Sequence, residues 1–184
     1  MNNYIKVFKK VFMLVVFLLA SASLYSQDTI RNAQDFADMV PNGSYILMYD
    51  ITVTQMYTQT FTGQFNGNNK KITVQINENT TNVGLFSQVD GSGIIDRLIV
   101  DGYIIGGPNS ENVGGIVGQL LGGLLHNNIN LASVTGTNPT SSVGGIIGSV
   151  DLSGFHNLLM NNCANNGTIT GGQYLQALLV DAMH

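Results

Sequence analysis

Residues 112–118 read N-V-G-G-I-V-G and residues 142–148 read S-V-G-G-I-I-G, and this recurring motif decides the fold. A weaker copy, N-V-G-L-F-S, occupies residues 82–87. Each copy contains one valine, and the step between successive valines is 30 residues: Val83, Val113 and Val143. A constant period of this length is typical of repeat architectures, in which each unit stacks on the preceding one.

A second pattern follows each copy and ends in a short β-prone segment before a glycine, at residues 103–105, 133–135 and 168–170. Each unit therefore offers about three short strands separated by turns. One such unit cannot bury its apolar face alone, whereas units stacked at about 4.8 Å pair their strands in parallel and share an interior. We expect an all-β chain, folded as a right-handed parallel β-helix of about four coils. Asparagines near the turns are expected to stack as amide ladders: Asn127, Asn128, Asn161 and Asn162.

The motif itself leaves two conformations open, because Val113 and Ile116 have opposite parity along a strand. In the first, which we favour, the Gly-Gly pair forms a bulge that turns all the apolar residues inward. In the second, Phe86, Ile116 and Ile146 form an outward apolar stripe that serves as a contact surface.

The segment ahead of the repeats predicts a cap over their first open edge. Residues 29–40 have apolar positions at helical spacing, Asn32 or Thr29 as the N-cap, and a Pro-Asn-Gly stop. This helix lies within a cap at residues 27–41, and the β-helix repeats occupy residues 42–184. Residues 44–54 are predicted to form a strand, and residues 71–76 form another, with Ile72, Val74 and Ile76 on one face.

Residues 1–26 have the three-part layout of a secretory signal peptide, with cleavage near 22–26. Three lysines precede an apolar run at residues 11–20, and small residues follow. An uncleaved signal anchor is the alternative. The run is short for a bilayer span, so we expect a secreted or cell-surface protein without a membrane span after cleavage.

The end of the chain departs from the repeat. Residues 174–184 read Y-L-Q-A-L-L-V-D-A-M-H, where another glycine motif is expected. We interpret this end as a truncated array, with a closing cap or a shifted reading frame as the alternatives.

Charge and composition exclude several functions. Only 10% of the 184 residues are charged, and 22 are glycine. After residue 26 the chain has four basic residues against 11 acidic ones, which gives a net charge of −7. This charge repels phosphate backbones, so we expect no nucleic-acid partner.

No residues form a recognisable catalytic, cofactor-binding or metal-binding motif, so we predict no enzyme activity and no cofactor. The densest acidic group is Asp90, Asp96 and Asp101, which we interpret as solvated turn residues. His126 and His156 are one repeat apart and would lie on neighbouring coils, but neither they nor His184 have ligand spacing. The single cysteine, Cys163, excludes an intrachain disulfide and is interpreted as a small buried residue.

These glycine motifs, each followed by G-x-x-x-N and a short strand, resemble GLUG-motif repeats. The segment F-T-G-Q-F-N-G-N-N-K-K-I at residues 61–72 resembles the usual start of such arrays. The resemblance covers residues 30–171 and implies a bacterial, secreted or surface-exposed protein with a pectate-lyase-like β-helix. It supplies no catalytic motif.

Three functions remain open at this point. The leading hypothesis is a non-catalytic extracellular protein that binds a glycan or another extracellular protein. The second is a polysaccharide lyase or hydrolase, which needs acidic residues converging in one groove. The third is a structural segment of a larger surface protein.

Overall fold

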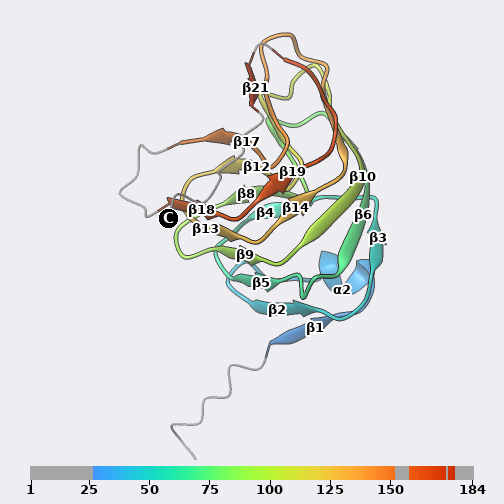
Figure 1. Cartoon of the computed structure of the whole chain (residues 1–184), viewed down its shortest axis with the longest axis vertical. Helices are drawn as coiled ribbons and strands as arrows, with labels where there is room; N and C mark the ends of the chain where they lie inside the picture. The colour runs from blue at the N-terminus through green and yellow to red at the C-terminus, as the bar shows by residue number, and fades with distance from the viewer. Residues whose placement is uncertain (1–26, 152–157, 173, 177–184) are drawn as a thin grey trace, which may run out of the picture.

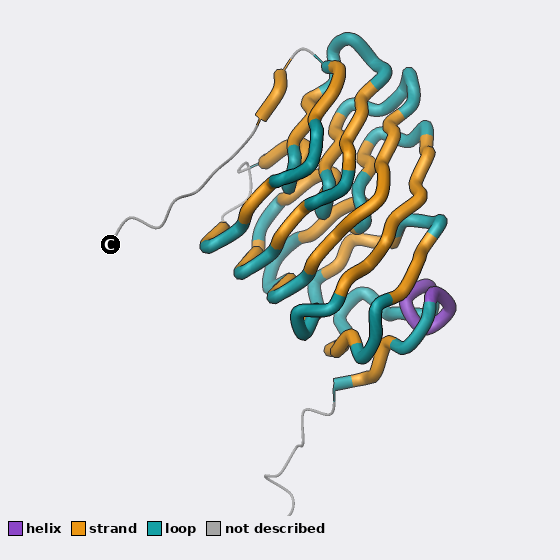
Figure 2. The backbone as a smooth tube through the Cα atoms, turned by 45° about the vertical axis from the view of Figure 1, so that its right-hand side comes forward, coloured by secondary structure: helices purple, strands orange, loops and turns teal. Residues whose placement is uncertain are grey.

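The computed structural model describes residues 27–151, 158–172 and 174–176. Within the described residues, the regular secondary structure is almost entirely β-strand, with one five-residue helix. All of its strand pairs are parallel. Figures 1 and 2 show strands from successive parts of the chain lying side by side, with the helix at the N-terminal end. The all-β class is thus confirmed.

The described strands form four sheets. Sheet A has the order β1 (Asp28–Ile30), β2 (Ser44–Leu47), β5 (Gln64–Asn66), β9 (Ile94–Asp96), β13 (Gly123–His126) and β18 (Leu158–Asn161). Sheet B is built on β3 (Ile51–Val53), β6 (Lys71–Glu78) and β10 (Ile99–Gly106), followed by β14 (Ile129–Asn130), β15 (Ser133–Gly136), β19 (Ala164–Asn165) and β20 (Ile169–Gly171). Sheet C contains β4 (Tyr57–Phe61), β8 (Phe86–Val89), β12 (Val117–Leu120) and β17 (Ile147–Val150). Sheet D contains β7 (Asn82–Val83), β11 (Asn112–Gly114), β16 (Ser142–Gly144) and β21 (Tyr174–Gln176).

The predicted register of the motif valines is confirmed. Val113 of β11 pairs with Val83 on one side and with Val143 on the other. All three side chains are fully buried. Leu175 of β21 then takes the next backbone position beside Val143, so the sheet continues past the last complete motif.

The step is not 30 residues everywhere. His126 of β13 pairs with Asp96 one step before it, but with Asn161 on the other side, which is 35 residues later. The last unit therefore contains five additional residues ahead of β18. The expectation that His126 and His156 lie on neighbouring coils stays a prediction, because His156 lies outside the described residues.

The Gly-Gly motif turns a corner between two sheets. Residues 112–114 belong to sheet D and residues 117–120 belong to sheet C. Ile116 at the corner and Val117 after it are both fully buried. The apolar residues therefore all point inward, as we favoured, but through a bend between strands rather than a bulge within one strand.

The outward stripe is consequently wrong. Phe86 and Ile116 are fully buried, and Ile146 is 2% exposed. Phe86 also pairs with Val117 and not with Ile116, because the first copy has only Leu85 at the corner where the second has Gly115 and Ile116.

The core consists of inward-facing columns that run across the strands. In sheet A, one column passes through consecutive strands at Phe65, Ile95, Leu125 and Met160. Each of these side chains is at most 8% exposed. Full burial of a side chain of this size stabilises the fold by about 1.5–3 kcal/mol. The alternation predicted for β6 is confirmed, since Ile72, Val74 and Ile76 are all fully buried.

The N-terminal helix is shorter than predicted. Helix α2 (Ala33–Ala37) begins after Asn32, whose Oδ1 accepts a 3.0 Å hydrogen bond from the amide of Asp35. Thr29 and Ile30 belong instead to β1, which pairs with β2. Ile30 thereby reaches the core, where it is 1% exposed. In the same region the single strand predicted over residues 44–54 is divided into β2 and β3.

Candidate functional site

Four turns that connect sheet A to sheet B stack into a polar ridge. They follow β5, β9, β13 and β18, and each contains a residue in the left-handed backbone region: Asn69, Arg97, Asn127 and Asn162, which we call the asparagine ridge. Their φ angles are 55°, 51°, 55° and 50°. Asparagine tolerates this conformation because its short side chain bonds locally. The turns are joined by backbone hydrogen bonds, such as Arg97 N to His126 O at 3.0 Å.

Arg97 is the exception on the ridge. A left-handed conformation costs a residue of this kind about 1–2 kcal/mol, and such strain points towards function when the surrounding structure maintains it. Here Nε of Arg97 forms a 2.8 Å ion pair with Oδ2 of Asp96. Its side chain is 45% exposed, and the rest of the guanidinium has no other hydrogen bond or ion pair in the described chain.

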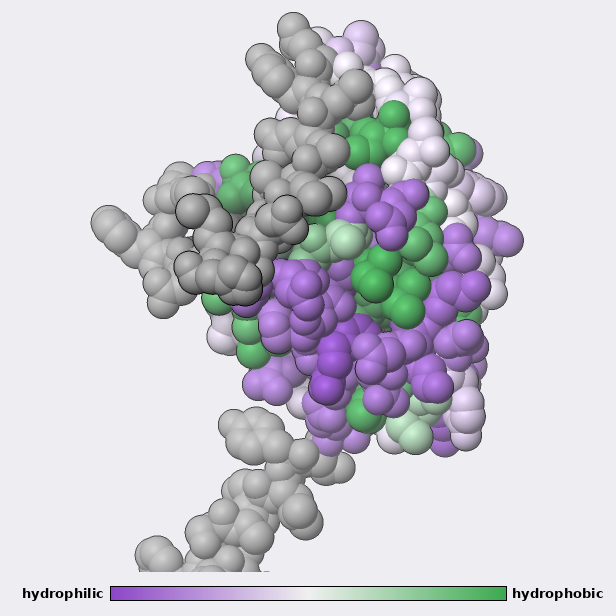
Figure 3. Space-filling view, in the orientation of Figure 1, coloured by the Kyte–Doolittle hydropathy of each residue, from purple (hydrophilic) through white to green (hydrophobic). Residues whose placement is uncertain are grey.

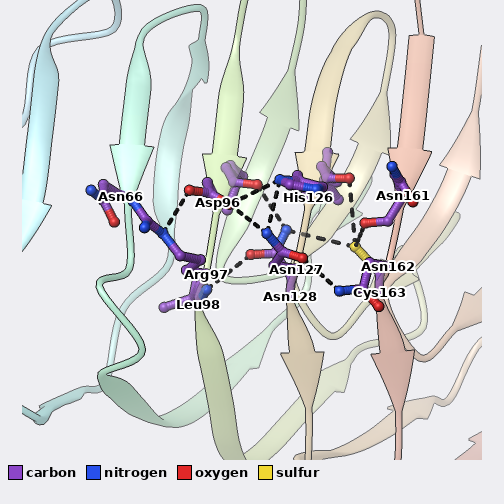
Figure 4. A network of polar contacts seen from close by, with 12 residues as sticks. Asn66, Asp96, Arg97, Leu98, His126, Asn127, Asn128, Asn161, Asn162 and Cys163 are labelled. Atoms are coloured by element: carbon purple, nitrogen blue, oxygen red, sulfur yellow. Dashed lines mark hydrogen bonds and ion pairs between the residues drawn. The ribbon is translucent and has the colours of Figure 1, made fainter.

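Polar contacts run along the ridge from one turn to the next (Figure 4). Asn162 Nδ2 donates to Asn127 Oδ1 at 2.6 Å, which confirms the predicted amide stacking for this pair. Asn127 Nδ2 lies 2.9 Å from Nδ1 of His126 and donates to Oδ1 of Asp96 at 3.4 Å. The same His126 nitrogen lies 3.3 Å from Oδ1 of Asp96. The network therefore fixes the orientation of the Asn127 and Asn162 amides before any ligand arrives.

The other predicted ladder residues have different partners. Asn128 is fully buried; its Oδ1 accepts from Leu98 N at 3.0 Å, and its Nδ2 donates to Ile95 O at 2.8 Å. Asn161 lies beside His126 in the backbone register. Asn128 thus holds the turn from inside, while the ridge residues face outward.

A hollow of about 360 Å³ lies on the ridge, lined by the four ridge residues together with Ile129 and Ala164. Ile129 and Ala164 pair in register at the start of the sheet B strands, and Ile99 continues the row. Leu131, further along, is 41% exposed. On the face drawn in Figure 3, apolar patches lie beside strongly hydrophilic areas. The site thus offers amide and guanidinium groups next to an apolar strip.

The acidic residues considered for catalysis do not share a strand or a sheet. Asp96 ends β9 in sheet A, Asp101 lies in β10 of sheet B, and Asp90 follows β8 of sheet C. Asp96 pairs with Arg97, and Asp101 pairs with Lys71 at 3.2 Å. Within the described residues, no three His, Cys, Asp or Glu side chains gather in a group suited to a metal ion.

Cys163 is buried, as predicted, at 4% exposure. Its burial raises the pKa of the thiol, which donates to the carbonyl of Asn161 at 3.5 Å. A cysteine in this environment is a core residue and not a nucleophile. His184 lies outside the described residues.

A second and larger pocket, of about 430 Å³, lies between α2 and the chain from β3 to β4. Sequence reasoning missed it, because its walls come from segments that carry no motif. The ridge was also missed as a site, because asparagines in turns are fully explained by their structural role there. Only Arg97 is a residue type that this structural role does not explain.

Among known proteins, no family model, no curated protein and no solved structure matches this chain. In the described part, the helical segment lacks the length and apolar character required to cross a membrane.

Proposed function

We propose that this chain is a secreted or cell-surface protein that binds a neutral extracellular glycan along the asparagine ridge, without catalysis. The hollow at Arg97 carries the proposal. The part of the Arg97 guanidinium that Asp96 leaves unpaired and the side-chain amide of Asn69 lie there beside the apolar strip of Ile129 and Ala164. A sugar presents hydroxyl groups at its rim and C–H groups on its ring face, which such a mixed surface complements. The net charge of −7 after residue 26 favours a neutral glycan over a polyanionic one.

The fold we propose is the right-handed parallel β-helix, with the four sheets as its faces. The in-register parallel pairing of Val83, Val113 and Val143 supports it. The right hand is the general rule for parallel strands joined by crossover connections. On this fold the ridge is a long edge with one turn per coil, a geometry suited to a chain-like ligand. The resemblance to GLUG-motif repeats remains a prediction based on the glycine motifs.

The binding test uses the chain from residue 27 onward on an array of neutral and anionic glycans and of extracellular matrix proteins. We expect binding to neutral glycans, with a preference for oligosaccharides over single sugars because several ridge turns contribute. Binding to matrix proteins alone would replace the glycan with a protein partner. No binding to any of them would overturn the proposed function.

Arg97→Asn is the diagnostic variant, because asparagine already occupies the same left-handed position at Asn127 and Asn162. The variant keeps the turn and removes the guanidinium. We expect about tenfold weaker glycan binding, the equivalent of one charged hydrogen bond, with unchanged or higher thermal stability. Arg31→Asn is the matched control, since Arg31 is also exposed and pairs with a nearby aspartate, Asp35, away from the ridge.

Export is tested separately. Full-length protein expressed in a bacterial host is fractionated, and the N-terminus of the extracytoplasmic product is sequenced. We expect a new N-terminus just after residues 22–26. Retention of the full chain in the cytoplasm would contradict the proposed localisation.

A further inference from the structure

The second pocket, which we call the capping pocket, has an apolar floor and a polar rim. Its floor consists of buried side chains: Phe36, Val53, Met56 and Tyr57. Its rim contains Gln34, Thr54, Gln55, Thr58, Gln59 and Glu78. A volume of about 430 Å³ lies within the range of small-molecule sites, which typically combine such a floor with a few polar groups.

Most of the rim is available to a ligand. The amide of Gln34 donates to Asp38 at 2.8 Å and is therefore occupied. In the described chain the side chains of Thr54, Gln55, Thr58 and Gln59 make no hydrogen bond, and all four are exposed. They can therefore orient a ligand without first breaking internal bonds.

Glu78 gives the pocket its charge. It is the only acidic side chain lining the pocket, and no basic side chain lines it. Its carboxylate forms no ion pair with any described residue. Tyr57 adds no second charge, because burial raises its pKa to about 12, and its hydroxyl donates to Met39 O at 3.3 Å. The pocket therefore carries one half-buried, unpaired negative charge above an apolar floor.

We propose that the capping pocket binds a small organic cation, with an ammonium group on the Glu78 carboxylate and an aliphatic or aromatic body against Met56 and Tyr57. An anion would be repelled by Glu78. A purely apolar ligand would leave the carboxylate and the rim hydroxyls without partners. A cation satisfies the carboxylate, and the excess of acidic residues after residue 26 attracts it.

The test compares n-butylammonium with its neutral counterpart 1-butanol, by backbone amide NMR titration of the chain from residue 27 onward. We expect shifts confined to α2, residues 54–59 and the end of β6, and about tenfold tighter binding of the cation. Raising the salt concentration should weaken the binding of n-butylammonium and leave the binding of 1-butanol unchanged. Equal affinity for both probes, or shifts away from these residues, would refute the proposal.

Glu78→Gln tests the assigned charge while keeping the length and shape of the side chain. In this variant we expect the two probes to bind with equal affinity. Glu111→Gln is the control, because Glu111 is exposed and does not line the pocket. A cation preference that survives in Glu78→Gln, with a native amide spectrum, would overturn the role of Glu78.

Discussion

Gly115 lies against the buried side chain of Asn130, so that a Cβ atom on the glycine would be 2.6 Å from Cγ of Asn130. The amide of Asn130 is fully buried and donates to Oδ1 of Asn165 at 2.8 Å. The second glycine of the motif therefore makes room for an internal pair of amides. In the first copy, Leu85 occupies the corner, and the position in register with Asn130 is Val100.

Asn130→Ala should destabilise the fold by about 1–3 kcal/mol, because it leaves buried partners unsatisfied. The buried residue Ala132 loses both partners: its backbone amide loses its acceptor at 3.2 Å, and its carbonyl loses the Asn130 donor at 3.0 Å. Urea unfolding measures the change. Asn77→Ala is the control, since Asn77 is exposed in β6 and should change stability by no more than about 0.5 kcal/mol. An equal loss in both variants would contradict the internal amide pair.

Gly115→Ala should cost about 1–3 kcal/mol by overpacking the corner. The added methyl group collides with the carbonyl oxygen of Gly145 as well as with Asn130. Gly91→Asn is the comparison, because Gly91 has open space around it and asparagine tolerates its φ of 60°. If Gly115→Ala has the same urea midpoint of unfolding as the wild type, Gly115 does not pack closely against Gly145 and Asn130.

The repeat period was predictable from the sequence because stacking repeats the same environment every 30 residues. Glycines and valines then recur at the positions where backbones approach most closely. The corner at Gly115–Ile116 was less predictable, since strand parity applies only within one strand and the motif spans two. Asn130 was missed because asparagine is usually a turn residue, and its burial depends on the space left by a glycine 15 positions earlier.

The N-terminal cap and the last unit were predicted less well. Helical spacing over residues 29–40 did not reveal that Ile30 lies in strand β1, since this strand forms by pairing with β2 further along the chain. The five additional residues before β18 shift the partner of His126 from the expected position to Asn161. Register in a parallel sheet is fixed by the strands that pair, whereas loop lengths between them can vary.

Phe86→Ala should destabilise the fold by about 3–5 kcal/mol. Phe86 is fully buried at the centre of an aromatic cluster, with ring centroids 5.2 Å from Phe61 and 5.4 Å from Phe65. Thermal and urea unfolding measure the loss. Tyr49→Ala removes an aromatic ring that is 60% exposed and should change stability by no more than about 0.5 kcal/mol. Similar effects of the two changes would place Phe86 outside the core.

Asp101→Asn should lower stability by less than about 1 kcal/mol at neutral pH, because its side chain is 39% exposed and solvent screens its charge. The amide of Gly102 and the ammonium group of Lys71 lower the pKa of the Asp101 carboxyl. A lowered pKa in the folded state stabilises the fold above the ordinary aspartate pKa of about 3.9 and loses this effect as the pH falls further. The difference between wild type and variant should therefore shrink in acid. A difference that grows in acid would contradict the assignment.

Cys163 should react with a thiol reagent only after the chain opens. The side chain is 4% exposed, burial raises its pKa, and its sulfur lies within hydrogen-bond distance of two backbone carbonyls, those of Leu125 and Asn161, either of which can accept its single S–H. At pH 8 we expect labelling of the native protein to be on the order of 100-fold slower than labelling in urea, since it requires local opening. The control is a cysteine at the exposed position Gln75 in a Cys163→Ala background, which should react quickly in both conditions. Fast labelling of native Cys163 would show that the last described unit does not pack as a closed core.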